Sequence, residues 1–246
     1  MSSRLFQTNQ PPDRIKIVSW NSQSLNTKQI ELKKYIERNR PDVICVQETH
    51  KGYLDRPFQI LGYQSYISSK VQNKAGGTAM IVQESLIVHE INTDLPDTNI
   101  IKIKLKNEKY LQIVNCYRSP KTKIEIDKLT EEINKSREKN DHLMILGDFN
   151  AYSGLWYETK TDSRGRQMEK LIKKQNLIVV NSKEGTHIKQ NGQKSIIDLI
   201  MASPEIAMNL DYRVEEDPLG SGMLFTKGRT FYGDRMVCTV DPSAIH

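Results

Sequence analysis

The sequence predicts an α/β fold in which two mixed β-sheets pack together and helices flank them. Two observations support this prediction. Short apolar runs typical of strands alternate with helical patterns along the chain, and the middle of the chain is rich in strands. A chain of 246 residues can bury a substantial core, and neither an internal repeat nor a convincing linker divides it. We therefore expect a single domain built as a two-sheet sandwich.

The first elements alternate between strand and helix. Residues 15–20 form an apolar run typical of a strand, and residues 28–39 place Leu32 and Ile36 along one side of a helix that stops at Pro41. Residues 43–46 are apolar throughout, which indicates a short buried strand. Further strands are predicted at residues 78–82, 86–91, 101–105 and 110–116.

The second half of the chain continues the alternation. Ile126, Leu129 and Ile133 mark the apolar side of a helix whose other side is charged. The remaining predicted elements are a strand at 143–146, a helix at 163–175 and strands at 177–180 and 196–201. Residues 1–14 are polar and include two prolines, so we expect a flexible leader there.

Composition indicates the compartment and the class of partner. A net charge of +6 and a pI near 9.0 favour a polyanionic partner, with nucleic acid the first candidate, although many other proteins are equally basic. The cysteines are odd in number, widely spaced and without a zinc-binding pattern, which predicts reduced thiols and a nuclear or cytoplasmic location. No apolar run approaches the ~20 residues of a membrane span, so no membrane partner is expected.

Polar residues follow several predicted strands at the point where each strand ends. Asp148 and Asn150 come after the apolar run 143–146, and Gly147 lets the backbone turn there without a side chain. Asn21 closes the first strand, and Glu48 follows the strand 43–46. Such strand ends carry function on a rigid scaffold, and Glu48 is a hard oxygen ligand that suits Mg²⁺. For any one of them alone, a polar group that caps a strand is the simpler interpretation.

Several motifs together resemble the endonuclease/exonuclease/phosphatase superfamily, and most closely the apurinic-type endonuclease domain of non-LTR retrotransposons. The motifs are Ile17-Val18-Ser19-Trp20-Asn21, Pro41 to His50, Gly147 to Ala151, Leu155-Trp156, Thr161-Asp162-Ser163-Arg164-Gly165, Thr186-His187 and Ser195 to Pro204. The resemblance covers residues 15–220 and implies a four-layered, deoxyribonuclease-like α/β sandwich. It leaves residues 221–246 as a divergent C-terminal segment.

The resemblance also implies roles for individual residues. Glu48 would hold a divalent cation, Mg²⁺ or alternatively Mn²⁺, with Asn21 beside it as a second ligand. Asp148 would orient and deprotonate the attacking water, and Asn150 and Tyr117 would hold the scissile phosphate. Asp198 would orient a catalytic histidine further along the chain. His187 is close to Asp198 in sequence, but its place in the pattern favours a structural role.

The pattern breaks where the family has a Ser-Asp-His triplet before its last core strand. One alignment places Ser221-Gly222-Met223 there, and another places Gly233-Asp234-Arg235 ahead of a strand at 236–240. Arginine can donate to a phosphate but cannot share a proton near neutral pH. We therefore expect impaired cleavage, an unpaired Asp198 and a missing or badly formed last strand. His246 at the chain end is not expected to substitute.

Three hypotheses for function remain. In the first, the chain nicks double-stranded DNA so that reverse transcription can be primed, and Lys51, Arg118 and Tyr152 contact the DNA. In the family a reverse transcriptase domain follows, and this sequence ends before one. In the second, the chain is an inactive relic that binds DNA. In the third, the same fold acts on other phosphoesters, such as inositol phosphates or sphingomyelin.

Overall fold

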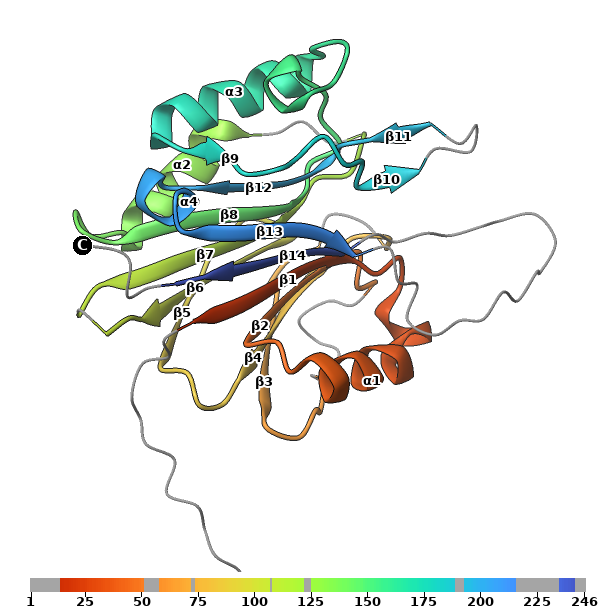
Figure 1. Cartoon of the computed structure of the whole chain (residues 1–246), viewed down its shortest axis with the longest axis vertical. Helices are drawn as coiled ribbons and strands as arrows, with labels where there is room; N and C mark the ends of the chain where they lie inside the picture. The colour runs from red at the N-terminus through yellow and green to blue at the C-terminus, as the bar shows by residue number, and fades with distance from the viewer. Residues whose placement is uncertain are drawn as a thin grey trace, which may run out of the picture.

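The computed structural model describes residues 14–50, 58–71, 74–106, 108–121, 125–188, 193–215 and 235–241. In this part of the chain two six-stranded sheets pack against each other, and a short two-stranded ribbon extends from one end (Figure 1). Helices cover the outer sides of the sheets, so the predicted α/β sandwich is confirmed. The predicted leader lies almost wholly outside the described residues.

The strands of the two sheets come from both halves of the chain. The first sheet contains, in order across it, β13 (Leu210–Glu215), β14 (Arg235–Val240), β1 (Ile15–Asn21), β2 (Val43–Gln47), β4 (Thr78–Gln83) and β3 (Tyr63–Ile67). The second contains β5 (Val88–Ile91), β6 (Thr98–Lys104), β7 (Tyr110–Tyr117), β8 (His142–Asp148), β12 (Asp198–Ala202) and β9 (Ile178–Val179). The ribbon pairs β10 (His187–Ile188) with β11 (Lys194–Ser195).

The longer helices form the outer layers, whereas the shortest α-helix packs Ile206 into the core between the sheets. The helices are α1 (Gln29–Asn39), α2 (Ile126–Ser136), α3 (Ser163–Gln175) and α4 (Pro204–Ala207), with 3₁₀-helices η1 (Leu25–Thr27) and η2 (Gly154–Trp156). α1 buries Leu32, Tyr35 and Ile36 against the first sheet, while α2 and α3 cover the second. No helix in the described ranges combines the length and apolar character needed to cross a lipid bilayer.

The core between the sheets is built by alternation along each strand. Ile15 and Ile17 of β1 face the second sheet, whereas Val18 and Trp20 face α1. Strands such as β2 and β8 are buried along their whole length because each is covered on both sides, which explains their continuous apolar runs. All three cysteines are buried, and burial raises the pKa of each thiol.

Two parallel strand pairs determine where the strand ends meet. β1 runs parallel to β2 with Asn21 opposite Gln47, and β7 runs parallel to β8 with Tyr117 opposite Asp148. The carboxyl ends of parallel strands lie at the same edge of a sheet. Each sheet therefore has two neighbouring strand ends at one edge. How the two sheets pack decides whether these two edges meet.

The last strand is present, which corrects the expectation that it is missing or badly formed. β14 lies between β13 and β1 and is antiparallel to both. Its residues Met236, Cys238 and Val240 enter the core between the sheets, and Val237 packs on the α1 side. A run that is apolar on both faces suits an interior strand even where the preceding motif is altered. Residues 216–234, with the first aligned triplet, lie outside the described residues.

Candidate active site

Asn21 joins the two carboxylates that the sequence singled out. Its Nδ2 donates to Glu48 Oε1 at 2.9 Å and to Asp148 Oδ2 at 2.9 Å. These three residues come from the ends of β1, β2 and β8, and therefore from both sheets. The two parallel strand pairs thus do meet at one edge of the sandwich. The structure brings Glu48 and Asp148 to one site, although 100 residues of sequence separate them.

Asp148 is held by its neighbour two residues on. Its Oδ1 accepts hydrogen bonds from the backbone N of Asn150 at 3.0 Å and from Asn150 Nδ2 at 2.8 Å. Asn150 adopts the left-handed backbone conformation with φ 47°, which asparagine tolerates better than most residues. Burial, and then the negative charge of Glu48, raise the pKa of Asp148 to about 7. The carboxyl can therefore exchange a proton near neutral pH.

Tyr117 completes the group on the β7 side. The ring is buried, and its hydroxyl interacts with Glu48. Burial and the negative charges of Glu48 and Asp148 raise the pKa of this phenol above its usual value. The phenol consequently stays protonated and acts as a hydrogen-bond donor beside the two carboxylates.

Glu48 is the more open of the two carboxylates and lies in a strained turn. It has φ 50° and His50 has φ 56°, an uncommon conformation for either residue. Glu48 Oε2 lies 3.9 Å from His50 Nε2, so His50 is a site neighbour that sequence reasoning did not assign. The left-handed backbone carries the Glu48 side chain out of β2 and over the strand ends.

Two buried amide side chains, those of Gln47 and Asn115, connect the two sheets next to the site. Gln47 Nε2 donates to Asn115 Oδ1 at 2.7 Å, which links β2 of one sheet to β7 of the other. Asn115 Nδ2 donates in turn to the backbone oxygens of Val46 and Ala79 at 3.1 Å each. Sequence reasoning gave neither amide a role. Such fully buried amides between sheets hold the two halves of the site in register.

The residues fit a divalent cation of the magnesium type. Glu48 and Asp148 supply carboxylate oxygens, and Mg²⁺ in proteins is held by one or two carboxylates with substrate phosphate and water. Within the described ranges no cluster of three or more His, Cys, Asp or Glu side chains has ligand geometry, which excludes a closed, zinc-like centre there. Asn21 turns its amide nitrogen toward both carboxylates and orients them, and its role as a second ligand stays a prediction.

Arg118, predicted to contact DNA, is bonded within the protein, and its DNA contact stays a prediction. Its side chain is buried, and Nη1 donates to the backbone oxygens of Pro96, Asp97 and Tyr117 at 3.1, 3.2 and 2.8 Å. Nη2 donates to the Thr98 hydroxyl at 3.0 Å. The guanidinium therefore fastens the turn before β6 to the end of β7. Arg118 follows Tyr117 by one residue, and successive side chains of an extended segment point to opposite sides.

The other predicted residues have different outcomes. Tyr152 is half-buried beside the site and stays a predicted DNA contact, while Lys51 lies outside the described residues. Asp198 begins β12 directly opposite Asp148 and is buried; it has an interaction partner, so the expectation of an unpaired carboxylate is wrong. His187 lies in the ribbon, paired with Ser195.

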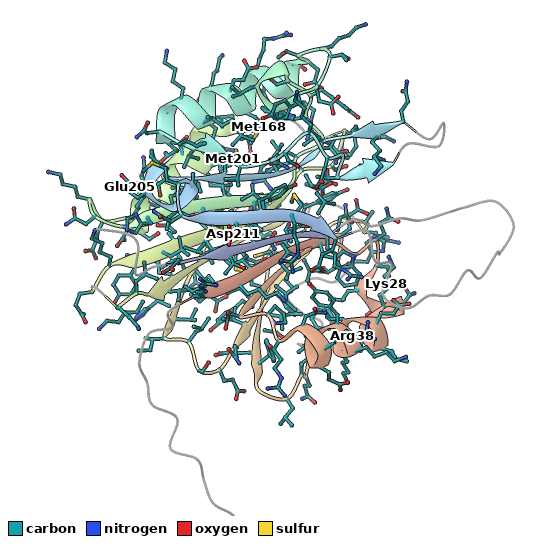
Figure 2. The ribbon with its side chains drawn as sticks, viewed as in Figure 1. Lys28, Arg38, Met168, Met201, Glu205 and Asp211 are labelled. Carbon is teal, nitrogen blue, oxygen red and sulfur yellow. The ribbon has the colours of Figure 1, made fainter. Side chains whose placement is uncertain are left out.

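Arg235, which the second alignment puts in place of histidine, points away from the carboxylates. Its guanidinium lies over the rings of Tyr35 and Trp20, at 4.6 and 5.6 Å from their centroids, on the side of the sheet that α1 covers. Lys28 Nζ lies 5.6 Å from the centroid of the same Trp20 ring (Figure 2 labels Lys28). Lys28 also interacts electrostatically with Glu48. The two cations beside the Trp20 ring, Lys28 and Arg235, therefore lie near the site.

Comparisons with known proteins agree with this geometry. A family model described as endonuclease-reverse transcriptase matches residues 111–222. The structure superposes on the endonuclease domain of TRAS1, a telomere-specific non-LTR retrotransposon, with a TM-score of 0.74 and 19% identity over 92% of this chain and 98% of that one. This likeness shows that the chain has the fold of that endonuclease domain.

Two curated relatives match parts of this chain. A probable RNA-directed DNA polymerase from transposon BS of Drosophila melanogaster is 26% identical over 64% of this chain. The DNA-(apurinic or apyrimidinic site) endonuclease 2 of Xenopus laevis is 37% identical over 29% of this chain. The matches span only 18% and 14% of those relatives' lengths.

Proposed function

We propose that the chain is the endonuclease domain of a non-LTR retrotransposon, which hydrolyses a phosphodiester of double-stranded DNA with a divalent cation bound. The observation that carries this proposal is the single amide of Asn21, which bridges Glu48 and Asp148. Around this bridge lie a protonated phenol, Tyr117, and an oriented amide, Asn150. The combination offers a base, hydrogen-bond donors and hard oxygen ligands within one site.

Each residue has a distinct part in this proposal. Asp148, with its pKa of about 7, accepts the proton of the attacking water. Asn150 keeps the Asp148 carboxyl oriented, and the Tyr117 hydroxyl donates to the phosphate oxygens. Glu48 would hold Mg²⁺ or Mn²⁺, and the bound ion offsets the negative charge on the phosphate. Asn21 keeps the two carboxylates in a fixed relation.

The proposed substrate follows from charge and from the relatives. The net charge of +6 favours a polyanion, and the matched relatives include an endonuclease domain and a DNA polymerase of mobile elements. We propose that the nick supplies the primer for reverse transcription by a polymerase domain of the element. Phosphate contacts give affinity without reading bases, so target choice would rest on groove shape and on loops such as that of Tyr152.

The position of Arg235 favours a second candidate, a DNA-binding relic with slow or absent cleavage. With its guanidinium stacked on Trp20 and Tyr35, Arg235 does not take the place of an imidazole beside Asp148. We therefore expect cleavage slower than is typical of the superfamily. DNA binding with a steep salt dependence and no cleavage would favour the relic.

A plasmid-nicking assay tests the proposal. Supercoiled plasmid is incubated with the protein and Mg²⁺, and nicked product is measured for the wild type, Glu48→Gln and Asp148→Asn. We expect both variants to lose at least about 100-fold in rate, because each removes a charge at the reacting phosphate. Asp211→Asn, an exposed carboxylate of β13, serves as the control. If Asp148→Asn still nicks plasmid at the wild-type rate, the reaction does not take place at this site.

A small-substrate assay tests the remaining hypothesis. Hydrolysis of inositol phosphates or sphingomyelin, lost in the same two variants, would show a phosphoesterase of another specificity. Plasmid nicking without hydrolysis of these substrates supports the endonuclease.

A further inference from the structure

The segment from Thr161 to Gly165 locks the start of α3 onto the loop that follows β8. Asp162 caps the helix by accepting from the backbone N of Gly165 at 2.6 Å, and it also accepts from the backbone N of Tyr152 at 3.3 Å. A Cβ on Gly165 would lie 1.9 Å from the Tyr152 backbone oxygen, so only glycine allows this approach. The helix start and the loop that carries Asn150 are therefore one packed unit.

Arg164, inside this segment, donates to both loops at the end of the second sheet. Its Nη2 donates to the backbone oxygens of Phe149 at 2.7 Å and Arg118 at 2.8 Å, and its Nε donates to Phe149 at 3.3 Å. Its Nη1 donates to the Pro120 oxygen at 3.4 Å. Phe149 follows β8, while Arg118 and Pro120 follow β7 (Figure 1). One planar guanidinium thus ties the two strand ends of the candidate site together.

The Arg118 backbone oxygen connects Arg164 to Asn150. This oxygen accepts from Arg164 Nη2 at 2.8 Å and from Asn150 Nδ2 at 3.3 Å. The same Asn150 Nδ2 donates to Asp148 Oδ1 at 2.8 Å. The carboxamide of Asn150 is therefore fixed by two acceptors, and Arg164 holds one of them in place. Asn150 needs such fixing because its left-handed backbone is a minority conformation.

We propose that Arg164 is a positioning residue, which sets the orientation of the Asn150 carboxamide against Asp148 through the shared Arg118 carbonyl; the proposal rests on the proposed nuclease function. Arg164 touches neither carboxylate directly and interacts with Asp148 only electrostatically. Its role is to keep Asn150 and Tyr117, which come from different strand ends, at a constant separation. A lysine carries all its donors on one nitrogen, so it cannot hydrogen-bond to both loops in one plane as the guanidinium does.

A purely structural role makes different predictions. In that case, replacing Arg164 would lower the melting temperature and the yield of folded protein, but each folded molecule would keep its Asn150 orientation and its kcat. A positioning role requires that the Asn150 carboxamide changes its environment even in molecules that remain folded.

The test compares Arg164→Lys and Arg164→Ala with Arg166→Ala. Arg166 is exposed on the same helix, and its Nη1 donates only to the nearby Thr161 oxygen among the bonds described, at 3.2 Å. The side-chain NH₂ resonances of Asn150 are recorded by ¹H–¹⁵N NMR and assigned by their loss in Asn150→Ala. We expect them to shift or broaden in both Arg164 variants and to stay in place in Arg166→Ala. This readout does not depend on the rate of nicking.

Kinetics provide the second readout. We expect kcat for plasmid nicking to fall by about 10- to 100-fold in Arg164→Ala, with KM for DNA changed by less than about threefold, because positioning rather than binding is lost. Added guanidinium ion at low millimolar concentration should restore part of kcat in Arg164→Ala and none in Arg166→Ala. Arg164→Lys keeps the stem and charge, so it decides the question if Arg164→Ala fails to fold.

The two proposals fail in different ways. Asn150 resonances and kcat that are unchanged in folded Arg164→Lys would overturn the positioning role, even if Asp148→Asn abolishes nicking. Nicking that persists in Asp148→Asn would overturn the proposed function, while the Asn150 resonances would still report whether Arg164 positions that carboxamide.

Discussion

Neutralising Asp148 should change how the stability of the metal-free protein depends on pH. Asp148 is 3% exposed and faces Glu48 through the shared Asn21 amide. Burial and the charge of Glu48 raise its pKa from 3.8 to about 7. Ionising Asp148 therefore costs the folded protein free energy. Asp148→Asn removes that ionisation and leaves a side chain of nearly the same shape.

The size and sign of the effect follow from the two pKa values. Between pH 3.8 and about pH 7 the folded protein holds a proton on Asp148 that the unfolded chain has released. The free energy of unfolding contributed by this group therefore falls as pH rises through this window, and the loss is complete above about pH 7. One pKa unit corresponds to about 1.4 kcal/mol, so the whole shift amounts to about 4 kcal/mol.

The variant also carries a cost that does not depend on pH. In Asp148→Asn, the introduced carboxamide has two possible orientations. It would either bring its own NH₂ group against Asn21 Nδ2 or place that group against both Asn150 donors, which would then lose their acceptor. Such a mismatch costs about 1–3 kcal/mol. We therefore expect Asp148→Asn to be less stable than the wild type near pH 4.5. By pH 8 it should be equally or more stable.

Urea unfolding followed by tryptophan fluorescence measures this difference, because Trp20 and Trp156 are both buried. The wild type, Asp148→Asn and the control Asp211→Asn are unfolded in EDTA at pH 4.5 and pH 8. Groups common to all three proteins cancel in the difference between variant and wild type. A difference for Asp148→Asn that moves by less than about 1 kcal/mol between the two pH values would refute the reasoning. The control should show no such movement.

Two further predictions concern residues around the site. Gly147→Ala should destabilise the protein by more than about 3 kcal/mol in thermal or urea unfolding. The reason is that Gly147 has φ +139° and an added Cβ would lie 1.9 Å from the Cys116 backbone oxygen. The control Gly154→Ala, whose added Cβ would have nothing within 4 Å, should change stability by less than about 1 kcal/mol. Arg118→Ala should cost about 2–4 kcal/mol, since several carbonyls lose their donor, yet leave the salt dependence of DNA binding unchanged. A lower slope of log Kd against log salt in a folded Arg118→Ala sample would restore Arg118 as a phosphate contact.

The strands that sequence reasoning found and those it missed differ in burial. β2 and β8 are covered on both sides and stand out as apolar runs, so both were predicted within two residues of their bounds. β3 and β13 lie at the edges of the first sheet and are largely half-exposed, so neither has a continuous apolar run and neither was predicted. The strand at 236–240 was recognised as an apolar run, but its place inside the sheet depends on pairing with β1 and β13.

Sequence reasoning also mistook the direction of some side chains. Tyr117 and Arg118 are adjacent, and a sequence shows that both leave the same strand without showing which one faces the carboxylates. Arg235 presents the same problem. In β14 it pairs with Trp20 of β1, and both side chains lie on the side of the sheet that α1 covers. His50 and Arg164 were given no role because neither is at a strand end. The structure places His50 beside Glu48 and bonds Arg164 to backbone carbonyls.

The sequence by itself determined the class of fold, the buried strands and the polar residues where those strands end, because these depend on the local periodicity of apolar side chains. Only the tertiary structure decided that these ends form one site. The hydrogen bond from Asn21 to Asp148 joins residues 127 apart, and the bond from Gln47 to Asn115 joins the two sheets. Such contacts depend on how two sheets pack and on which side of a strand each residue faces, and neither property is carried by any short segment of the chain.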